Sequence, residues 1–397
     1  MNQPTLPRFI VAYCGLLLTL AAFSVDIMLP AFPDIAGDFA TDINIVQLVI
    51  PAFIASIGVG QIICGSLSDK YGRKPVILAG LAVFLVGTLC CVFAPTIEFL
   101  LLGRILQGLG CATATVLGRT VLRDMFSGND LARNLALAMM VFAFGPIVAP
   151  LIGAGLMLFT GWRVVFGVMM ALGLLLLFVT IVTLPETLKK KNPDAMRFSR
   201  IGNCIGAVIN HPQSRFYLLL SAFTYALMLL ILTNLPQVFD RNFGISGTWF
   251  AILFAIHGFG IIIGQFANRR LIDGIGVLRT TLSGSVVLFA VATIMVMSAH
   301  AGLLGPYFLS GMMIAFATSF LIVYANSAAM TLDPHGEIAG FTSSFYGFFS
   351  QVGGTILVIP LSFLISGDLI IFTVILATLS LLVMICLWRW APEAENT

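Results

Sequence analysis

One carboxylic acid, Asp26, lies inside a long apolar run, with Phe23, Val25, Ile27 and Leu29 around it. The other acidic residues fall near the ends of such runs or between them. Apolar surroundings remove hydration and favour the protonated acid, whereas a nearby cation favours the charged form. We therefore expect Asp26 to exchange a proton for a cation or a cationic substrate. The alternative is a helix-end Asp that accepts hydrogen bonds from backbone N–H groups.

A cation, Arg104, stands inside another apolar run, in the segment GRILQG at 103–108. Gln107 lies one helical turn from Arg104, so both side chains can share one face. An arginine inside a membrane helix costs at least about 2–3 kcal/mol unless it faces water or a partner. At 1.5 Å per residue, Asp26 would lie roughly 9 Å before Phe32, and Arg104 roughly 10 Å after Ile97. Phe32 and Ile97 are both expected on the outer side of the membrane, so the two charges would lie at a similar depth. We predict that they share a wet cavity and interact, either directly or through water or another side chain such as Gln107. The alternative is that Arg104 reaches the membrane surface.

The composition shows that the elements holding these charges are membrane helices. Of 397 residues, 59% are hydrophobic and 9% are charged, and the mean hydropathy is +1.06. Soluble domains have about 25% charged residues. A soluble enzyme, a nucleic-acid-binding protein and a disordered protein are therefore excluded. The seven cysteines lack metal-ligand spacing, and no nucleotide-binding G-x-x-x-x-G-K-[ST] run is present, so we expect no metal, no cofactor and no enzyme.

Twelve apolar runs are long enough to span a membrane, which requires about 20 residues. The runs cover 8–30, 43–68, 75–95, 97–121, 131–159, 162–184, 214–240, 247–270, 276–299, 302–327, 337–365 and 368–390. A polar, lysine-rich stretch at 185–213 separates six runs from six. The sequence predicts an all-α membrane protein with two six-helix halves, 1–184 and 214–397, joined by a linker at 185–213. Cations gather in alternate loops, which places the linker and both termini in the cytoplasm.

The loop after the second run reads GSLSDKYGRKP at 65–75. It resembles, residue for residue, the G-x-L-x-D-x-x-G-R-K signature of the major facilitator superfamily. The resemblance implies a cytoplasmic latch between helices in which Asp69 and Arg73 hold the outward-facing state. The expected gate residues are Gly65, Asp69, Gly72, Arg73 and Lys74.

A weaker copy of this motif occurs in the second half. Gly264 stands four residues before Asn268, as Gly65 stands four before Asp69, and two arginines follow at 269–270. An amide replaces the carboxylate, so this copy cannot form the same ion pair. The copy favours an internal duplication with an asymmetric latch.

Further stretches resemble the Bcr/CflA (bicyclomycin-resistance-type) group of drug/proton antiporters in that superfamily. They include DIMLPAFPDIA at 26–36, GRTVLRDMF at 118–126 and LDPHGEIAG at 332–340. The run at 103–112 resembles the superfamily's R-x-x-Q-G-x-G-x-A pattern, and 145–155 carries a G-P-x-x-x-P-x-x-G pattern similar to that of its antiporters. The resemblance implies a multi-pass, monomeric protein of a bacterial inner membrane.

Polar residues inside the remaining spans are candidates for a substrate cavity. As a set they suit a large amphipathic ligand held by aromatic area and few polar anchors, although interhelical hydrogen bonding explains any one of them. The predicted cavity residues are Tyr13, Gln47, Gln107, Tyr225, Asn234, His257, Tyr324, Asn326, Tyr346 and Gln351.

These features favour a secondary transporter that exports small amphipathic compounds in exchange for protons, in contact with membrane lipid and without nucleic acid. Two other functions stay open at this point. One is an exporter dedicated to an endogenous metabolite such as a siderophore. The other is a proton-coupled uptake symporter, which the helix pattern at 145–155 disfavours.

Overall fold

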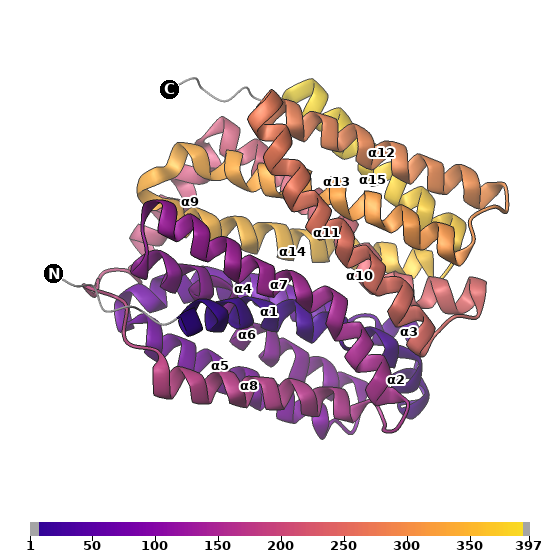
Figure 1. Ribbon diagram of the computed structural model, residues 1–397, viewed down its shortest axis with the longest axis horizontal. Coiled ribbons are helices and arrows are strands. Elements are labelled where there is room, and N and C mark those ends of the chain that lie inside the picture. Colours follow the sequence, from indigo (N-terminus) through magenta and orange to yellow (C-terminus); the bar gives the residue numbers. More distant parts are fainter. Residues whose placement is uncertain (1–7, 392–397) are drawn as a thin grey trace.

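The computed structural model describes residues 8–391, and within that range every regular element is helical (Figure 1). Eleven stretches are long and apolar enough to cross a membrane, and one of them, Pro306–Ile365, contains two long helices. The chain therefore has twelve spans, which confirms the predicted fold class.

The first half contains six spans built from nine helices. They are α1 (Arg8–Asp26), η1 (Leu29–Ala31), α2 (Phe32–Asp38), α3 (Ile43–Val46), α4 (Val49–Tyr71), α5 (Arg73–Val92), α6 (Ile97–Met125), α7 (Gly128–Met157) and α8 (Arg163–Thr183).

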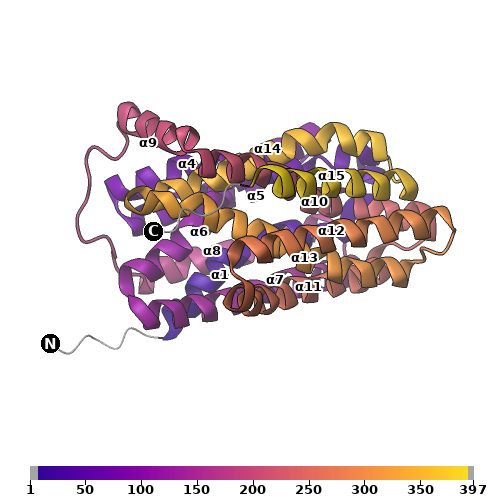
Figure 2. The same ribbon diagram turned by 90° about the horizontal axis from the view of Figure 1, so that it is seen from above.

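The second half repeats this number of spans after a short helix, α9 (Phe198–Asn210). Its elements are α10 (Pro212–Phe243), α11 (Gly247–Ile275), α12 (Val277–His300), α13 (Pro306–Leu332), η2 (Asp333–Ile338), α14 (Ala339–Ile365) and α15 (Leu369–Trp390). The halves lie side by side, with α4 against α14 and α7 against α11. Figure 2 shows α9 and the start of α1 at one end of the bundle, which we call the linker end; the other is the far end.

The first span is broken, and proline explains where. Pro30 has no N–H for the carbonyl of Asp26, four residues earlier, and its ring clashes with a helix continued through that carbonyl. Accordingly α1 ends at Asp26, Ile27 and Met28 form a turn, and the 3-10 helix η1 follows. The predicted continuous helix 8–30 is wrong here, and its break falls at the residue expected to carry a proton.

The linker holds a helix that the sequence analysis did not predict. Residues 185–213 read as polar chain, yet α9 forms within them and contacts α10 and α14. Ile205 and Val208 lie on the side of α9 that packs on Phe345 and Tyr346 of α14. Because α9 is amphipathic, its apolar face is buried on the second half while its charged residues stay in water.

Glycines allow the closest helix crossings inside each half. A Cβ on Gly110 of α6 would lie 2.3 Å from the backbone nitrogen of Phe84 in α5. Where α4 contacts α6, a Cβ on Gly60 would lie 2.5 Å from the Cβ of Ala112. In the second half, a Cβ on Gly260 would lie 2.4 Å from the carbonyl oxygen of Ile314. Small residues at such positions let membrane helices pack on backbone.

Gly110→Ala should destabilise the folded protein, because the added methyl group meets the backbone of α5 and not a movable side chain. We expect a loss of about 1–3 kcal/mol, seen as a lower thermal unfolding midpoint in detergent. Gly167→Ala is the matched control, since a Cβ there meets nothing within 4 Å. Equal midpoints for the two variants would contradict the proposed close packing.

Candidate functional site

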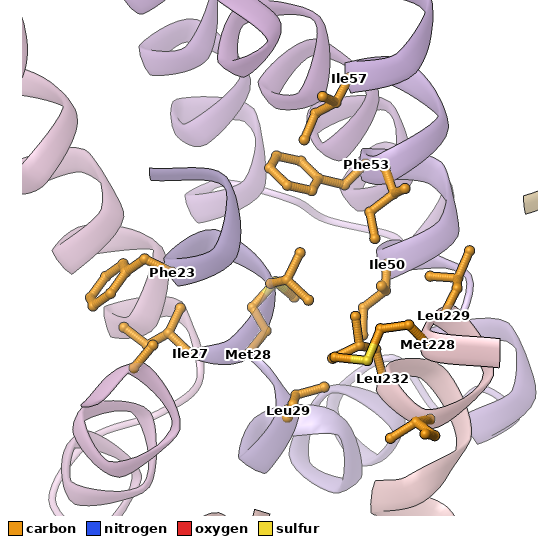
Figure 3. Close-up of a cluster of buried hydrophobic side chains, with 14 of the residues drawn as sticks. Phe23, Ile27, Met28, Leu29, Ile50, Phe53, Ile57, Met228, Leu229 and Leu232 are labelled. Carbon is orange, nitrogen blue, oxygen red and sulfur yellow. The ribbon is translucent and has the colours of Figure 1, made fainter. Parts of the chain in front are cut away.

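Asp26 is buried where α1 ends and has no polar partner. Its side chain is 3% exposed, and among the described residues it forms neither a hydrogen bond nor an ion pair. Apolar side chains surround this point, including Phe23, Ile27 and Met28, which Figure 3 shows beside the break in the span. The alternative of an Asp bonded to backbone N–H groups is therefore not what the structure has.

Arg104 is fully buried but does not pair with Asp26 in this structure. Its Nε donates to the carbonyl oxygen of Val49 at 3.2 Å, and its Nη1 donates to Oε1 of Gln107 at 2.9 Å. The guanidinium also lies 4.0 Å from the ring centroid of Phe53. Arg104 therefore holds α4 and makes no direct contact with Asp26, and the alternative of reaching the membrane surface is wrong.

The two halves meet at the far end through a closed apolar cluster. Figure 3 shows Met28 and Leu29 of the first span, Ile50 of α4, and Leu229 and Leu232 of α10 packed together, all of them buried. The far end is therefore sealed by side chains from both halves.

One polar contact accompanies this seal. Gln47 donates from Nε2 to Oε1 of Gln237 at 2.7 Å. Among residues 8–391 it is the one side-chain hydrogen bond that joins the two halves. Gln47 is thus a contact between halves, whereas the sequence predicted a cavity position.

At the linker end, the signature loop forms a charged brace inside the first half. Arg73 of α5 is 6% exposed and binds two carboxylates, Asp69 of α4 at 2.6 Å and Asp124 of α6 at 2.9 Å. Its Nη1 also donates to Oγ of Ser68 at 2.7 Å. The brace therefore fastens α4, α5 and α6 to one another, and it does not cross to the second half.

Glu186, just after α8, completes the brace from the linker. Its carboxylate accepts from the backbone N–H groups of Arg73 at 2.9 Å and Lys74 at 3.3 Å. Gly72 sits between α4 and α5 with φ +114, and a Cβ there would collide with the Glu186 carboxylate. The glycine is therefore required both for its backbone conformation and for this close approach. Lys74 reaches the carbonyl oxygen of Ile181 at 2.9 Å.

Gly65 is the gate residue that does face the second half. A Cβ on Gly65 would lie 3.5 Å from Oγ of Ser344 in α14. The corresponding loop of the second half has only an amide contact, Nδ2 of Asn268 to Oδ1 of Asn326 at 3.1 Å between α11 and α13. The expected asymmetry between the two copies is therefore present in the structure, and Asn326 belongs to this contact.

Several predicted cavity residues are engaged inside one half. Tyr13 shares a 2.6 Å hydrogen bond with Thr180 of α8, and Gln107 donates to Thr88 at 2.8 Å. Asn234 donates to Ser362 of α14 at 2.9 Å. The structure therefore uses these three groups to hold neighbouring helices together.

His257 of α11 is also buried inside its half. Its Nδ1 lies 2.7 Å from the carbonyl oxygen of Phe254, and its Nε2 has no partner among the described residues. One ring nitrogen of His257 therefore lacks a hydrogen bond to the described residues.

The structure brings three of the predicted aromatic residues together on the second half. The ring of Tyr324 lies 5.6 Å from that of Tyr225 and 5.4 Å from that of Tyr346, measured between centroids. The Tyr324 hydroxyl lies 3.0 Å from Oγ of Ser350, and Tyr346 donates to the carbonyl oxygen of Tyr324 at 2.9 Å. Tyr225 and Tyr324 remain half-exposed. We call these three tyrosines the tyrosine cluster.

Gln351 is half-buried on α14, where it faces Gly58 of α4 in the other half. A Cβ on Gly58 would lie 3.2 Å from the Cβ of Gln351. Gln351 therefore lies at the boundary of the two halves, and its contact with substrate stays a prediction.

Sequence reasoning missed Asp124, Glu186 and Arg119. The first two carry no spacing signal of their own, since Asp124 lies 51 residues from the arginine it binds. Arg119 reads as one of several cations at a helix end, but it lies about 9 Å inside the α6 terminus at Met125. An arginine six residues before a helix end is the signal that could have identified it.

Comparison with known proteins agrees with this architecture. The chain is 30% identical over 348 residues to "Uncharacterized MFS-type transporter YdgK" of Bacillus subtilis, covering 86% of this chain and 85% of that one. It is 28% identical over 276 residues to a bicyclomycin resistance protein homolog of Haemophilus influenzae, covering 70% and 69%. Multidrug resistance protein MdtL of Shigella dysenteriae is 27% identical, covering 88% and 86%.

Solved structures share the fold at low sequence identity. A D-xylose–proton symporter superposes with a TM-score of 0.76 at 13% identity, over 98% of each chain. A bacterial homolog of the human lysosomal transporter Spinster, in an inward-facing and occupied conformation, gives 0.75 at 17% identity over the full length of both. The sequence model of the Major Facilitator Superfamily matches residues 14–357. With its twelve spans, its signature loop and this match, the chain belongs to the Major Facilitator Superfamily of secondary transporters and is not an enzyme.

Proposed function

We propose that this transporter exports small amphipathic compounds in exchange for protons. The observation that carries the proposal is the partnerless, buried carboxylate of Asp26 at the break of the first span. A carboxylate without a partner in apolar surroundings is unfavourable, so Asp26 must bind a proton or a cationic group of the substrate. The two occupants exclude each other, which is the requirement for exchange.

Proton binding at Asp26 can be coupled to the opening of the far end. Asp26 directly precedes the turn that carries Met28 and Leu29 into the apolar seal. The 3-10 helix η1, which begins three residues after Asp26, contacts α10 of the second half. A change of charge at Asp26 therefore acts on both sides of the seal, which supports alternating access driven by protonation.

Arg104 is the second residue proposed for coupling, through α4 and not through direct contact with Asp26. Its bonds to Val49 and to the ring of Phe53 fix the far-end turn of α4. Ile50 of that turn belongs to the seal. Movement of Arg104 would therefore displace a wall of the seal.

Multidrug export is favoured by the relatives named for bicyclomycin and multidrug resistance. An exporter of one endogenous metabolite and an uptake symporter are the competing functions. Efflux of a cationic dye, a neutral antibiotic and an anionic fluorophore from cells lacking their own pumps separates them. Export of several of these supports the multidrug function, export of none with transport of a single metabolite supports the dedicated exporter, and inward accumulation supports the symporter.

We further propose the topology and the division of the chain. The linker end, with Arg8 and Trp390 of the terminal helices, would be cytoplasmic, in a bacterial inner membrane. The moving units would be 1–184 and 214–397, with 185–213 as the connecting segment. The cations at this end, including the exposed Arg269 and Arg270, support this orientation.

Asp26→Asn should abolish proton release driven by substrate in proteoliposomes, because the amide cannot take up or release a proton. Asp34→Asn is the matched control, since Asp34 lies exposed on α2 eight residues later. Both variants should keep the wild-type thermal unfolding midpoint. Undiminished substrate-dependent proton release from the Asp26→Asn protein would refute the assignment.

Asp69→Ala should loosen the linker ends of α4, α5 and α6 within the first half, because it removes one of the two carboxylates bound to Arg73. Asp69 is 47% exposed at its side chain, so the expected effect is about 1 kcal/mol or less, or up to roughly fivefold in the population of the loosened helix ends. Spin-label distances across the linker end measure it.

Asn268→Ala is the comparison for this variant, because its amide contact with Asn326 involves no charge and should matter less. Unchanged distances together with normal transport in Asp69→Ala would show that the loop is only a turn.

A further inference from the structure

Arg119 lies on a stripe of α6 that faces the second half. Thr115, one turn earlier, accepts a 3.4 Å hydrogen bond from Gln61 of α4, and the Gln61 amide lies directly against Gly347 of α14. Arg123, one turn later, has its guanidinium 3.6 Å from where a Cβ of Gly340 in α14 would lie. Residues four apart share a helix face, so Arg119, between these two contacts, also faces α14.

Arg119 is exposed and has no partner at this position. The residue is solvent-accessible although protein surrounds it, and within residues 8–391 it forms no ion pair or hydrogen bond. The tyrosine cluster adjoins the same stripe, because Tyr346 directly precedes Gly347, and Gly347 faces the Gln61 amide that bonds Thr115. Asp124, the acid nearest in sequence, is bound to Arg73 and cannot neutralise it. Water-accessible surface between the halves therefore carries a free positive charge beside aromatic rings.

This combination has the chemistry of a binding site for an aromatic anion. A guanidinium presents five N–H donors in a fixed plane that matches a carboxylate, and it stays charged at every physiological pH. Half-exposed tyrosines 225 and 324, with Phe320 stacked 5.5 Å from Tyr324, offer flat apolar surface beside it.

We propose that Arg119 is the anion-binding residue of the substrate site, and that the compounds carried include aromatic amphiphiles bearing a carboxylate. The inference rests on the proposed export function, since it names the substrate class of the same site. In it, the carboxylate receives hydrogen bonds from Arg119 while the aromatic body packs on the tyrosine cluster.

The experiment measures equilibrium binding to the purified full chain by calorimetry, with no proton gradient. The probes are 1-naphthylacetate, ionised at neutral pH, and its neutral isostere 1-naphthylacetamide. Wild type should bind the anion about tenfold or more tightly than the amide, as expected for a charge-assisted hydrogen bond. Arg119→Gln should remove that preference while leaving amide binding unchanged, and Arg119→Lys should retain part of it.

Arg279→Gln is the matched control, because it removes one positive charge from an exposed site on peripheral α12 at the same end of the bundle. It should keep the full preference for the anion. The inference is overturned if wild type does not bind naphthylacetate, binds both probes equally, or keeps its preference in Arg119→Gln. Because this readout needs no transport, anion preference without proton-coupled efflux would refute only the proposed function, and efflux without anion preference only this inference.

Discussion

Every main-chain polar group in the membrane-spanning segments must find its partner inside the bundle, because the hydrocarbon around these segments offers none. That constraint favours continuous helices, because a helix bonds its own main-chain groups. An interruption leaves such groups without their usual partners. The first span breaks after Asp26, where Pro30 cannot bond the carbonyl of the acid itself. A backbone irregularity and an unpaired side-chain charge thus coincide, next to the seal between the two halves.

Charged groups elsewhere are used in two different ways. Arg73, Asp69 and Asp124 satisfy one another within the first half, and Glu186 ties the linker to the same point. This group joins three helices at one point. Asp26 and Arg119, by contrast, have no partners among the described residues and lie close to the second half. They are the groups proposed above for proton and substrate binding.

The sequence could predict the number of spans and the placement of Asp26 within the first of them, because hydropathy and residue count determine both. It could not predict that Arg104 turns toward Val49 or that Asp124 reaches Arg73, since these contacts depend on how α4 and α6 cross. The α9 helix was not predicted because it lies in the polar linker, and its apolar face acquires a partner only when α10 and α14 are in place. Arg119 resembled other cations at helix ends because its environment is set by α13 and α14, which begin 187 and 220 residues later.

The contact between Gln47 and Gln237 has a consequence for what limits the opening of the far end. Both groups are neutral amides, so their bond responds little to salt or to pH, and its net contribution is about 1 kcal/mol. Nearly all the resistance to opening must then come from hydrating Met28, Leu29, Ile50 and their neighbours. Hydration of apolar surface carries a large positive heat-capacity change. The equilibrium between closed and open far ends should therefore curve with temperature, and cooling toward 0 °C should weaken the seal.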